Sequence, residues 1–396
     1  MKTLNRRSFL QLSLATAASL ALAPRLNALE PGFKVEGKEG LFYHNDRPVT
    51  GETPAHLLND EFTPKKYAFI RNNGRMPDFD EETLSNWTLK ISGEACGKPV
   101  ELSLDELKAK FKHYTYSLVI ECGGNGRAEI VPATPGTKWG VGAVYCGRWK
   151  GVRLKDLLDF CEVGANAVYV GYVGADLPLD GDVEKKAISR GIPIAKAMSE
   201  ETLIAWEYEG EPISMPHGAP LRLVAGGFPG SVSGKWLTEL LIRDKVHDGE
   251  KMKNGSYMVP KDPIAPGFKD KVESVIIESM PVKSLITRPK SGIALKAGEA
   301  LEVLGHAWAG ELAVKEVFIS IDYGASWVKT KLQKPHNRLA WQTFSASISL
   351  PKPGYYELWA RAVDEGGISQ PMVLPTWNSK GYLNNSCHRV SINVSA

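Results

Sequence analysis

Cysteine is scarce in this 396-residue sequence: there are 5 cysteines, and no two of them form a Cys-x-x-Cys pair. This scarcity excludes a disulfide-framework fold and argues against zinc ribbons, iron–sulfur clusters and covalently attached c-type haem. The 48 lysine and arginine residues nearly balance the 45 aspartate and glutamate residues, and no basic tract is present. A nucleic-acid partner is therefore not expected.

Long apolar runs are also missing, with one exception near the N-terminus. Lys2, Arg6 and Arg7 precede an uncharged, alanine- and leucine-rich run at residues 10–23, which is too short to span a bilayer. Paired arginines followed by Phe9-Leu10 are typical of a bacterial twin-arginine signal. The alternative is an anchoring helix or a chance arginine pair. We predict a signal peptide over residues 1–28, cleaved near Leu26-Asn27-Ala28 or at a competing site within residues 20–23.

Twin-arginine signals export folded proteins, often with a cofactor already inserted, so this signal favours a redox cofactor. We therefore expect the mature protein in the periplasm, without a membrane span. Cleavage would remove Lys2, Arg6, Arg7 and Arg25 and no acidic residue, which leaves 44 basic against 45 acidic residues and a net charge of −1. Such a protein has no global field that attracts anions, so any anion site needs a local cluster of positive charge.

The mature sequence divides into two predicted domains, residues 29–275 and residues 276–396. Residues 29–85 read as long ordered loops. Beyond them we predict strands at 87–91, 117–121, 168–173, 203–208 and 221–224, and helices from Ser103 and at 154–161, 193–198 and 235–242. After residue 275, short strands separated by glycine turns predict a β-sandwich.

A glycine-rich segment, Gly230-Ser231-Val232-Ser233-Gly234-Lys235, superficially resembles a phosphate-binding loop. It is one residue shorter than a Walker A motif, and Trp236 stands where serine or threonine should bind magnesium, so a nucleotide triphosphatase is not expected. Backbone N–H groups of such a loop, before a predicted helix, can still bind an anion. The alternative is an ordinary helix start without a ligand.

Cys122 differs from the other cysteines, Cys96, Cys146, Cys161 and Cys387, which we interpret as small core residues. It ends a predicted strand and is followed by Gly123-Gly124-Asn125-Gly126. Glycines at this place let the backbone approach a bulky group closely, and a thiolate is a suitable ligand for a redox metal. Disulfide pairing among the other four cysteines is left open.

Two further groups of polar residues are candidates for anion binding. The segment Arg71-Asn72-Asn73-Gly74-Arg75 has arginines on both sides of a polar turn, where they could hold an oxyanion through paired hydrogen bonds. His217 and Arg222 are five residues apart across Pro220. The alternatives are a solvated loop and polar residues at a strand edge.

Together these segments resemble the sulfite oxidase family of molybdenum enzymes over nearly the whole mature chain. The segments that carry the resemblance are Phe69-Ile70-Arg71-Asn72-Asn73, Glu121-Cys122-Gly123-Gly124-Asn125-Gly126-Arg127, Trp139-Gly140-Val141-Gly142, His217-Gly218-Ala219-Pro220-Leu221-Arg222, Lys235-Trp236-Leu237, Gly305-His306-Ala307-Trp308 and Trp377-Asn378-Ser379-Lys380-Gly381. The resemblance implies an α+β fold class: a mixed α/β molybdopterin domain followed by an immunoglobulin-like β-sandwich that mediates a homodimer.

The resemblance also implies a role for each candidate site residue. Cys122 would be the protein thiolate on molybdenum, beside the two dithiolene sulfurs of one molybdopterin. Four residues would serve the substrate anion: Arg71, Arg127, Tyr257 and Lys380. Eight residues would bind the cofactor: Asn72, Asn73, Asp176, His217, Arg222, Ser233, Gly234 and Lys235.

The implied activity is oxidation of sulfite to sulfate by oxygen-atom transfer. The cofactor supplies the redox chemistry, and the protein supplies charge and orientation. Fewer than a hundred mature residues precede Cys122, so the haem domain of the vertebrate members does not fit there. We therefore expect no haem and electron transfer to a separate acceptor, a periplasmic cytochrome c.

Four positions depart from the family pattern and leave alternatives open. Gly126 replaces a common arginine, Asn73 a common histidine, Pro216 a usual aspartate and Lys380 another arginine. Because an ammonium is not equivalent to a guanidinium fork, the second candidate substrate is sulfur bound to a carrier protein, as in sulfane dehydrogenases. The β-sandwich argues against the related methionine sulfoxide reductase branch. A non-catalytic binding or adhesion protein would need Cys122 to be an ordinary core thiol.

Overall fold

The computed structural model describes residues 32–252, 255–268 and 270–396. The predicted signal peptide over residues 1–28 lies outside these ranges. Within them, no helix is long and apolar enough to cross a membrane. The described α-helices are short: α2 (Glu81–Ser85), α3 (Leu104–Lys110), α4 (Leu154–Phe160) and α5 (Ile194–Ala197).

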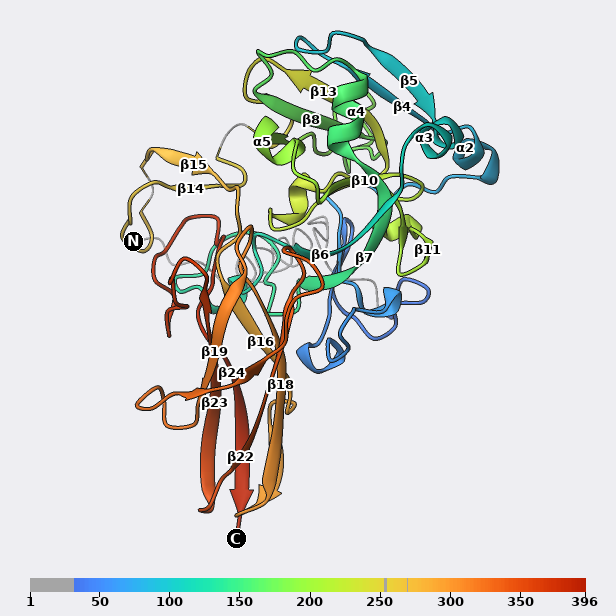
Figure 1. Ribbon diagram of the computed structural model, residues 1–396. Helices are drawn as coiled ribbons and strands as arrows, with labels where there is room; N and C mark the ends of the chain where they lie inside the picture. The colour runs from blue at the N-terminus through green and yellow to red at the C-terminus, as the bar shows by residue number, and fades with distance from the viewer. Residues whose placement is uncertain (1–31, 253–254, 269) are drawn as a thin grey trace, which may run out of the picture.

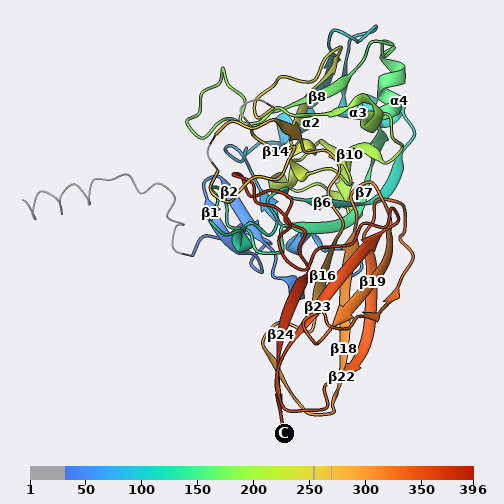
Figure 2. The same ribbon diagram turned by 90° about the vertical axis from the view of Figure 1, so that its left-hand side faces the viewer.

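The molecule is elongated and has two bodies (Figures 1 and 2). The first body contains sheets with short helices and holds most of the chain up to about residue 250. The second body is a β-sandwich that extends away from the first, with the C-terminus at its far tip.

Two five-stranded sheets form the centre of the first body. Their strands are β4 (Thr88–Ser92), β5 (Val100–Ser103), β6 (Tyr114–Glu121), β7 (Val144–Arg153), β8 (Tyr169–Gly174), β9 (Gly191–Pro193), β10 (Thr202–Tyr208), β11 (Glu211–Pro212), β12 (Arg222–Ala225) and β13 (Leu237–Arg243). One sheet has the order β11-β10-β7-β6, with β12 also paired to β10, and the other has the order β5-β4-β13-β8-β9. The five strands predicted for this region are confirmed as β4, β6, β8, β10 and β12.

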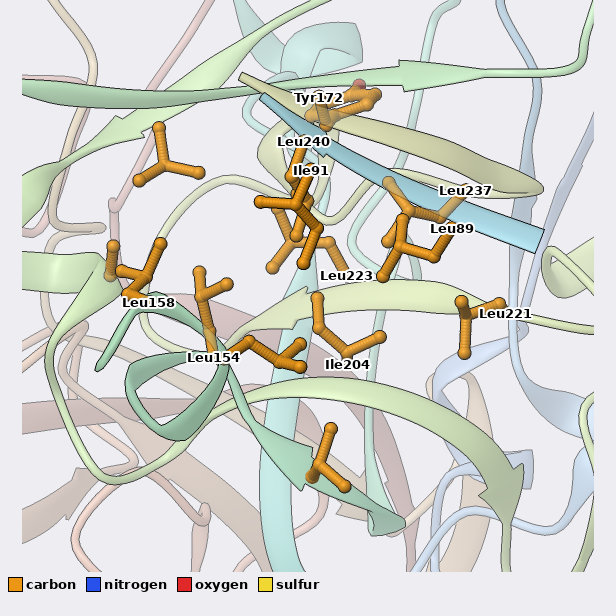
Figure 3. Close-up of a cluster of buried hydrophobic side chains, with 14 of the residues drawn as sticks. Leu89, Ile91, Leu154, Leu158, Tyr172, Ile204, Leu221, Leu223, Leu237 and Leu240 are labelled. Atoms are coloured by element: carbon orange, nitrogen blue, oxygen red, sulfur yellow. The ribbon is translucent and has the colours of Figure 1, made fainter. Parts of the chain in front are cut away.

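Leucine and isoleucine side chains from both sheets and from α4 meet in one apolar core (Figure 3). Leu89 and Ile91 of β4, Leu154 of α4, Ile204 of β10 and Leu240 of β13 are all at most 1% exposed. Burial of this apolar surface is the main driving force that holds the two sheets together. This core fixes the strand ends in place, and residues at those ends can therefore be held in a defined arrangement for a functional site.

The helices predicted from Ser103 and at residues 154–161 and 193–198 are confirmed as α3, α4 and α5. The start of α3 is a capping box, because Ser103 Oγ accepts the Glu106 N–H at 3.1 Å while the Glu106 carboxylate accepts the Ser103 N–H at 3.0 Å. Two otherwise unpaired N–H groups are satisfied in this way.

The helix predicted at residues 235–242 is wrong, because Leu237–Arg243 forms strand β13. Leu237, Leu240 and Leu241 have helical spacing, but β13 pairs with β4 on one side and β8 on the other. These two ladders satisfy its backbone and bury Leu237 and Leu240 completely. The glycine-rich loop therefore leads into a strand, and the helix N-terminus expected there for an anion is replaced by loop backbone.

Long ordered loops are predicted for residues 29–85, but the described part of this stretch, residues 32–85, contains regular secondary structure. They contain a three-stranded sheet of β1 (Phe42–Asp46), β2 (Val49–Glu52) and β3 (Ile70–Arg71). At the end of β2, the Glu52 carboxylate accepts the N–H groups of Gly140 at 2.8 Å and Gly142 at 2.9 Å. This buried carboxylate ties the small sheet to the loop before β7.

The second body confirms the predicted β-sandwich. Its strands are β16 (Lys283–Arg288), β17 (Ile293–Lys296), β18 (Ala300–Trp308), β19 (Val314–Ser320), β20 (Val328–Lys329), β21 (Lys331–Leu332), β22 (Gln342–Ser349), β23 (Gly354–Asp364) and β24 (His388–Ser395). One sheet has the order β16-β18-β22-β21, and the other has the order β17-β24-β23-β19-β20. Before the sandwich, β14 (Met258–Pro260) pairs with β15 (Ser274–Ile276).

A separate apolar cluster joins the two bodies. The first body contributes Leu58, Val119, Val144 and Cys146, and the sandwich contributes Leu285, Trp308, Ala340 and Trp341. All eight side chains are at most 6% exposed. Because Val119 and Val144 lie on the strands that flank Cys122, the sandwich packs directly behind the candidate site.

Candidate active site

A cavity of about 670 Å³, which includes part of its open mouth, lies in the first body beyond the end of β6. Nine of the thirteen predicted site residues line it: Arg71, Asn73, Cys122, Asp176, His217, Arg222, Ser233, Lys235 and Tyr257. Segments more than 180 residues apart in sequence therefore meet at one place. The roles of these residues toward a substrate or cofactor remain predictions from the sequence.

Cys122 is the first residue after β6 and lines the cavity. Its N–H donates to the Ala143 carbonyl at 2.9 Å, and its own carbonyl accepts the Asn125 N–H at 2.9 Å. A Cβ atom on Gly124 would lie 2.3 Å from the Arg127 guanidinium. A side chain at this position would therefore have to displace the Arg127 guanidinium.

Arg71, Asn73 and Tyr257 form one side of the cavity. Arg71 Nη2 donates to Asn73 Oδ1 at 3.2 Å, and the Tyr257 hydroxyl donates to the same oxygen at 3.4 Å. Arg71 Nη1 is buried and has no hydrogen-bond partner among the described residues. A guanidinium with a spare donor beside a tyrosine hydroxyl is suited to bind an anion.

Arg222, His217 and Ser233 lie on another part of the lining. Arg222 Nη1 donates to the Tyr145 hydroxyl at 3.2 Å and to the His217 carbonyl at 3.1 Å, and Arg222 Nε donates to the Ser233 carbonyl at 3.3 Å. Burial lowers the pKa of His217 well below its usual value, and the positive charges of Lys38, Lys235 and Arg222 add to this effect. Both effects favour the neutral form of the His217 ring.

Lys235 bonds through its ammonium group to Asn72 Oδ1 and to the Pro216 carbonyl. Burial, followed by the charge of Arg222, lowers the pKa of Lys235 well below its usual value. Burial raises the pKa of Asp176 to about 6, and the nearby Lys235 acts in the opposite direction. Positive groups thus outnumber the one carboxylate, and an incoming anion would relieve their repulsion.

Four predicted site residues lie outside the lining. Asn72 Oδ1 accepts a hydrogen bond from Lys235, which does line the cavity. A Cβ atom on Gly234 would lie 2.4 Å from the Tyr172 ring, so this glycine permits close packing beneath the loop. The guanidinium of Arg127 is directed to backbone, with Nε donating to the Lys380 carbonyl at 3.0 Å and Nη1 to the Thr137 carbonyl at 2.9 Å. The Lys380 side chain is exposed.

Several residues that complete the site were not predicted from the sequence. Tyr145, Tyr172 and Ser231 line the cavity. Arg190, which is 1% exposed, donates from Nη1 to Ser231 Oγ at 2.6 Å. Tyr382 stacks on Tyr257 with 5.4 Å between ring centroids. Ser231 belongs to the glycine-rich segment and could have been proposed from it, whereas Arg190 and Tyr382 have no local motif.

The residues present fit a molybdopterin. Four buried polar atoms at the site have no hydrogen-bond partner in the described part of the chain: Arg71 Nη1, Asn72 Nδ2, Arg190 Nε and His217 Nε2. Buried polar groups normally have partners, so these atoms are suited to a ligand rich in polar groups. Residues 32–252, 255–268 and 270–396 contain no cluster of three or more His, Cys, Asp and Glu residues. A metal held by Cys122 would thus take further ligands from its cofactor.

Comparison with known proteins agrees with this geometry. The family described as "Oxidoreductase molybdopterin binding domain" matches residues 73–251, and "Mo-co oxidoreductase dimerisation domain" matches residues 274–395. The mitochondrial sulfite oxidase of Homo sapiens is 33% identical over 381 residues, which cover 90% of this chain and 66% of the human protein. The chain therefore spans about two thirds of that relative.

Two further relatives are matched over a larger share of their own length. The sulfite oxidase of Gallus gallus is 30% identical over 368 residues, which cover 88% of this chain and 77% of the chicken protein. The crystal structure of the sulfane dehydrogenase SoxCD from Paracoccus pantotrophus is similar in fold, with a TM-score of 0.75 at 23% identity, covering 95% of this chain and 96% of that one. The chain belongs to the sulfite oxidase family of molybdopterin oxidoreductases.

Proposed function

We propose that the protein is a molybdenum-dependent sulfite dehydrogenase that oxidises sulfite to sulfate. The observation that carries this proposal is the cavity that Cys122 and Arg71 both line, with Arg71 Nη1 buried and without a hydrogen-bond partner among the described residues. A thiolate is a ligand for molybdenum, and a guanidinium donor is a partner for a small oxyanion. The family relatives named as sulfite oxidases add support.

The protein's own residues would perform distinct tasks. Cys122 would hold the metal, and Asn72, Asn73, Asp176, His217, Arg222, Ser233, Gly234 and Lys235 would hold the pterin and its phosphate. When bound, the molybdenum cofactor supplies two-electron oxygen-atom transfer. Arg71 would bind the sulfite oxygens, and the Tyr257 hydroxyl, fixed by Asn73, would orient the anion. Arg127 would contribute its positive charge from behind the loop.

The experiment measures metal and activity in the same preparation. Purified mature protein should contain about one molybdenum per chain and should reduce cytochrome c or ferricyanide when sulfite is added. Its absorption spectrum should lack haem bands. Bound molybdenum without sulfite turnover would contradict sulfite as the substrate but agree with the proposed cofactor. Absence of molybdenum from protein made in a cofactor-competent host would contradict both proposals.

Cellular context forms a second part of the proposal. The twin-arginine segment supports export of the folded protein to the periplasm, where a cytochrome c would accept the electrons. Replacement of Arg6 and Arg7 by lysine should retain the protein in the cytoplasm. The family match over residues 274–395 supports a homodimer, which light scattering on the eluting protein would measure directly.

Oxidation of carrier-bound sulfur is the second candidate. Lys380 stands in place of an arginine, and its side chain lies outside the cavity lining together with Arg127. Fewer fixed cations at the cavity would favour a less charged substrate. In this case free sulfite would be inactive, and turnover would require a persulfide on a partner protein.

A further inference from the structure

The loop that carries Cys122 is held by the β-sandwich as much as by its own domain. Five of the seven residues from Glu121 to Arg127 receive a hydrogen bond from, or donate one to, residues beyond 280. The Leu383 N–H donates to the Gly123 carbonyl at 2.9 Å, and Asn384 Nδ2 donates to the Gly126 carbonyl at 2.9 Å. Both ends of the loop are therefore fixed from the second body.

The strongest of these contacts is a buried ion pair next to Cys122. Lys283 Nζ lies 2.7 Å from Glu121 Oε1, and the two side chains are 9% and 1% exposed. Trp308 Nε1 donates to Glu121 Oε2 at 2.8 Å. Lys283 and Trp308 are partners across the β16–β18 ladder, so neighbouring strands of the sandwich present both groups to one carboxylate.

The same carboxylate transmits this contact to the cysteine. Asn125 Nδ2 donates to Glu121 Oε1 at 3.0 Å, and Lys283 Nζ also donates to the Asn125 carbonyl at 3.2 Å. Asn125 Oδ1 accepts the Ala143 N–H at 3.1 Å, and Ala143 in turn accepts the Cys122 N–H. A closed set of hydrogen bonds therefore joins Cys122, Asn125 and Ala143, and Asn125 connects this set to Glu121 and Lys283.

We infer that Lys283 and Trp308 are positioning residues of the active site, so that the β-sandwich fixes the thiolate ligand in addition to any role in dimerisation. A buried carboxylate without its cation is strongly unfavourable. Loss of Lys283 would therefore displace Glu121 and, with it, the adjoining cysteine. The inference rests on the proposed function only in taking Cys122 as the metal ligand, and it is independent of the substrate.

The test uses full-length chain and two readouts besides activity. The first is the alkylation rate of Cys122 by iodoacetamide in protein made without cofactor, followed by mass spectrometry, with Cys96 as an internal reference. The second is molybdenum content of protein made in a cofactor-competent host. Lys283→Met and Trp308→Phe should each change the Cys122 alkylation rate by about 10-fold and lower molybdenum content or turnover by about 10- to 100-fold.

The matched control is another buried lysine that joins the two bodies. Lys196 Nζ lies 2.9 Å from Glu311 and is 2% exposed, but its contacts are away from the Cys122 loop. Lys196→Met should lower the melting temperature by a similar amount and leave Cys122 alkylation and molybdenum content unchanged. The double variant Glu121→Gln, Lys283→Met removes both charges and should melt at a higher temperature than Lys283→Met alone.

The outcomes separate a positioning role from general destabilisation. The inference would be overturned if Lys283→Met, Trp308→Phe and Lys196→Met all changed Cys122 reactivity in proportion to their loss of melting temperature. Unchanged reactivity in Lys283→Met would also overturn it. If Lys283→Met does not fold, Trp308→Phe decides, because it keeps an aromatic ring, removes the N–H donor and leaves the ion pair between Lys283 and Glu121 in place. Sulfite inactivity with normal molybdenum content would overturn the proposed substrate and leave this inference intact.

Discussion

The guanidinium of Arg190 lies over the ring of Tyr257, with 4.5 Å between its Cζ atom and the ring centroid. Tyr257 has a φ of 51°, in the left-handed region that non-glycine residues rarely occupy. Arg190 and the stacked Tyr382 therefore fix a strained tyrosine, and its hydroxyl meets Asn73 as a consequence.

Arg190→Lys should lower kcat by about 10-fold, because a lysine keeps the charge but loses the planar contact with the ring. Steady-state kinetics with sulfite would measure this change. The same substitution in a Tyr257→Phe background should add little, since both changes act through one hydroxyl. Equal effects in both backgrounds would show that Arg190 acts by another route.

Arg71→Gln should raise the KM for sulfite by roughly 10- to 100-fold, the range expected when a hydrogen bond to a charged group is lost. The matched control is Arg75→Gln in the same segment, because the Arg75 guanidinium bonds to the Leu179 carbonyl outside the cavity. An equal rise in KM for both variants would argue against a specific role of Arg71.

Cys122→Ser should abolish sulfite oxidation and reduce bound molybdenum, because a hydroxyl is a poor replacement for a soft thiolate ligand. Metal analysis and turnover would be measured together. Cys96→Ser is the control, since Cys96 is partly exposed and lies away from the cavity. Full molybdenum content and activity in Cys122→Ser would contradict the proposed ligand.

Stability should fall as the pH drops from about 6.5 to about 4, and His306 is one cause. Burial lowers the pKa of His306 to about 4, and its Nε2 lies 2.9 Å from the Leu58 carbonyl across the two bodies. The unfolded histidine takes up a proton below pH 6.5 while the folded one stays neutral, so acid favours unfolding by up to about 3 kcal/mol at pH 4.

His306→Gln should flatten this pH dependence in urea unfolding measured from pH 7 to pH 4, even if it lowers stability at pH 7. His113→Gln serves as the control, because His113 is exposed. An unchanged slope in His306→Gln would mean that other groups cause the acid sensitivity.

Much of the fold could be predicted because local pattern and tertiary structure agree. Alternating or continuous apolar runs predicted β4, β6, β8 and β10, and Ser103 with Glu106 marked the start of α3. The prediction failed at β13, where leucines at helical spacing are buried by strands on both sides. The pairing of β13 with β4 and β8 depends on residues far away in the sequence, which a prediction from local sequence does not take into account.

The site residues that lie in recognisable sequence motifs could be predicted, and the others could not. Cys122, Arg71 and Lys235 lie in recognisable segments, and the cavity brings them together. Arg190, Tyr382 and Lys283 lie in segments without a chemical motif, and their partners are distant in sequence. Lys283 and Glu121, for example, are 162 residues apart.

The distant contacts of the Cys122 loop also impose an order on the making of the protein. Arg127 can form its hydrogen bond only after Lys380, 253 residues later in the sequence, has been synthesised. Gly126 likewise needs Asn384, 258 residues later. At ordinary rates of synthesis this is a delay of roughly 10 to 50 seconds. During that interval the Cys122 thiol is present without the residues that hold its loop in place. The site can therefore form completely only after residue 384 has been synthesised.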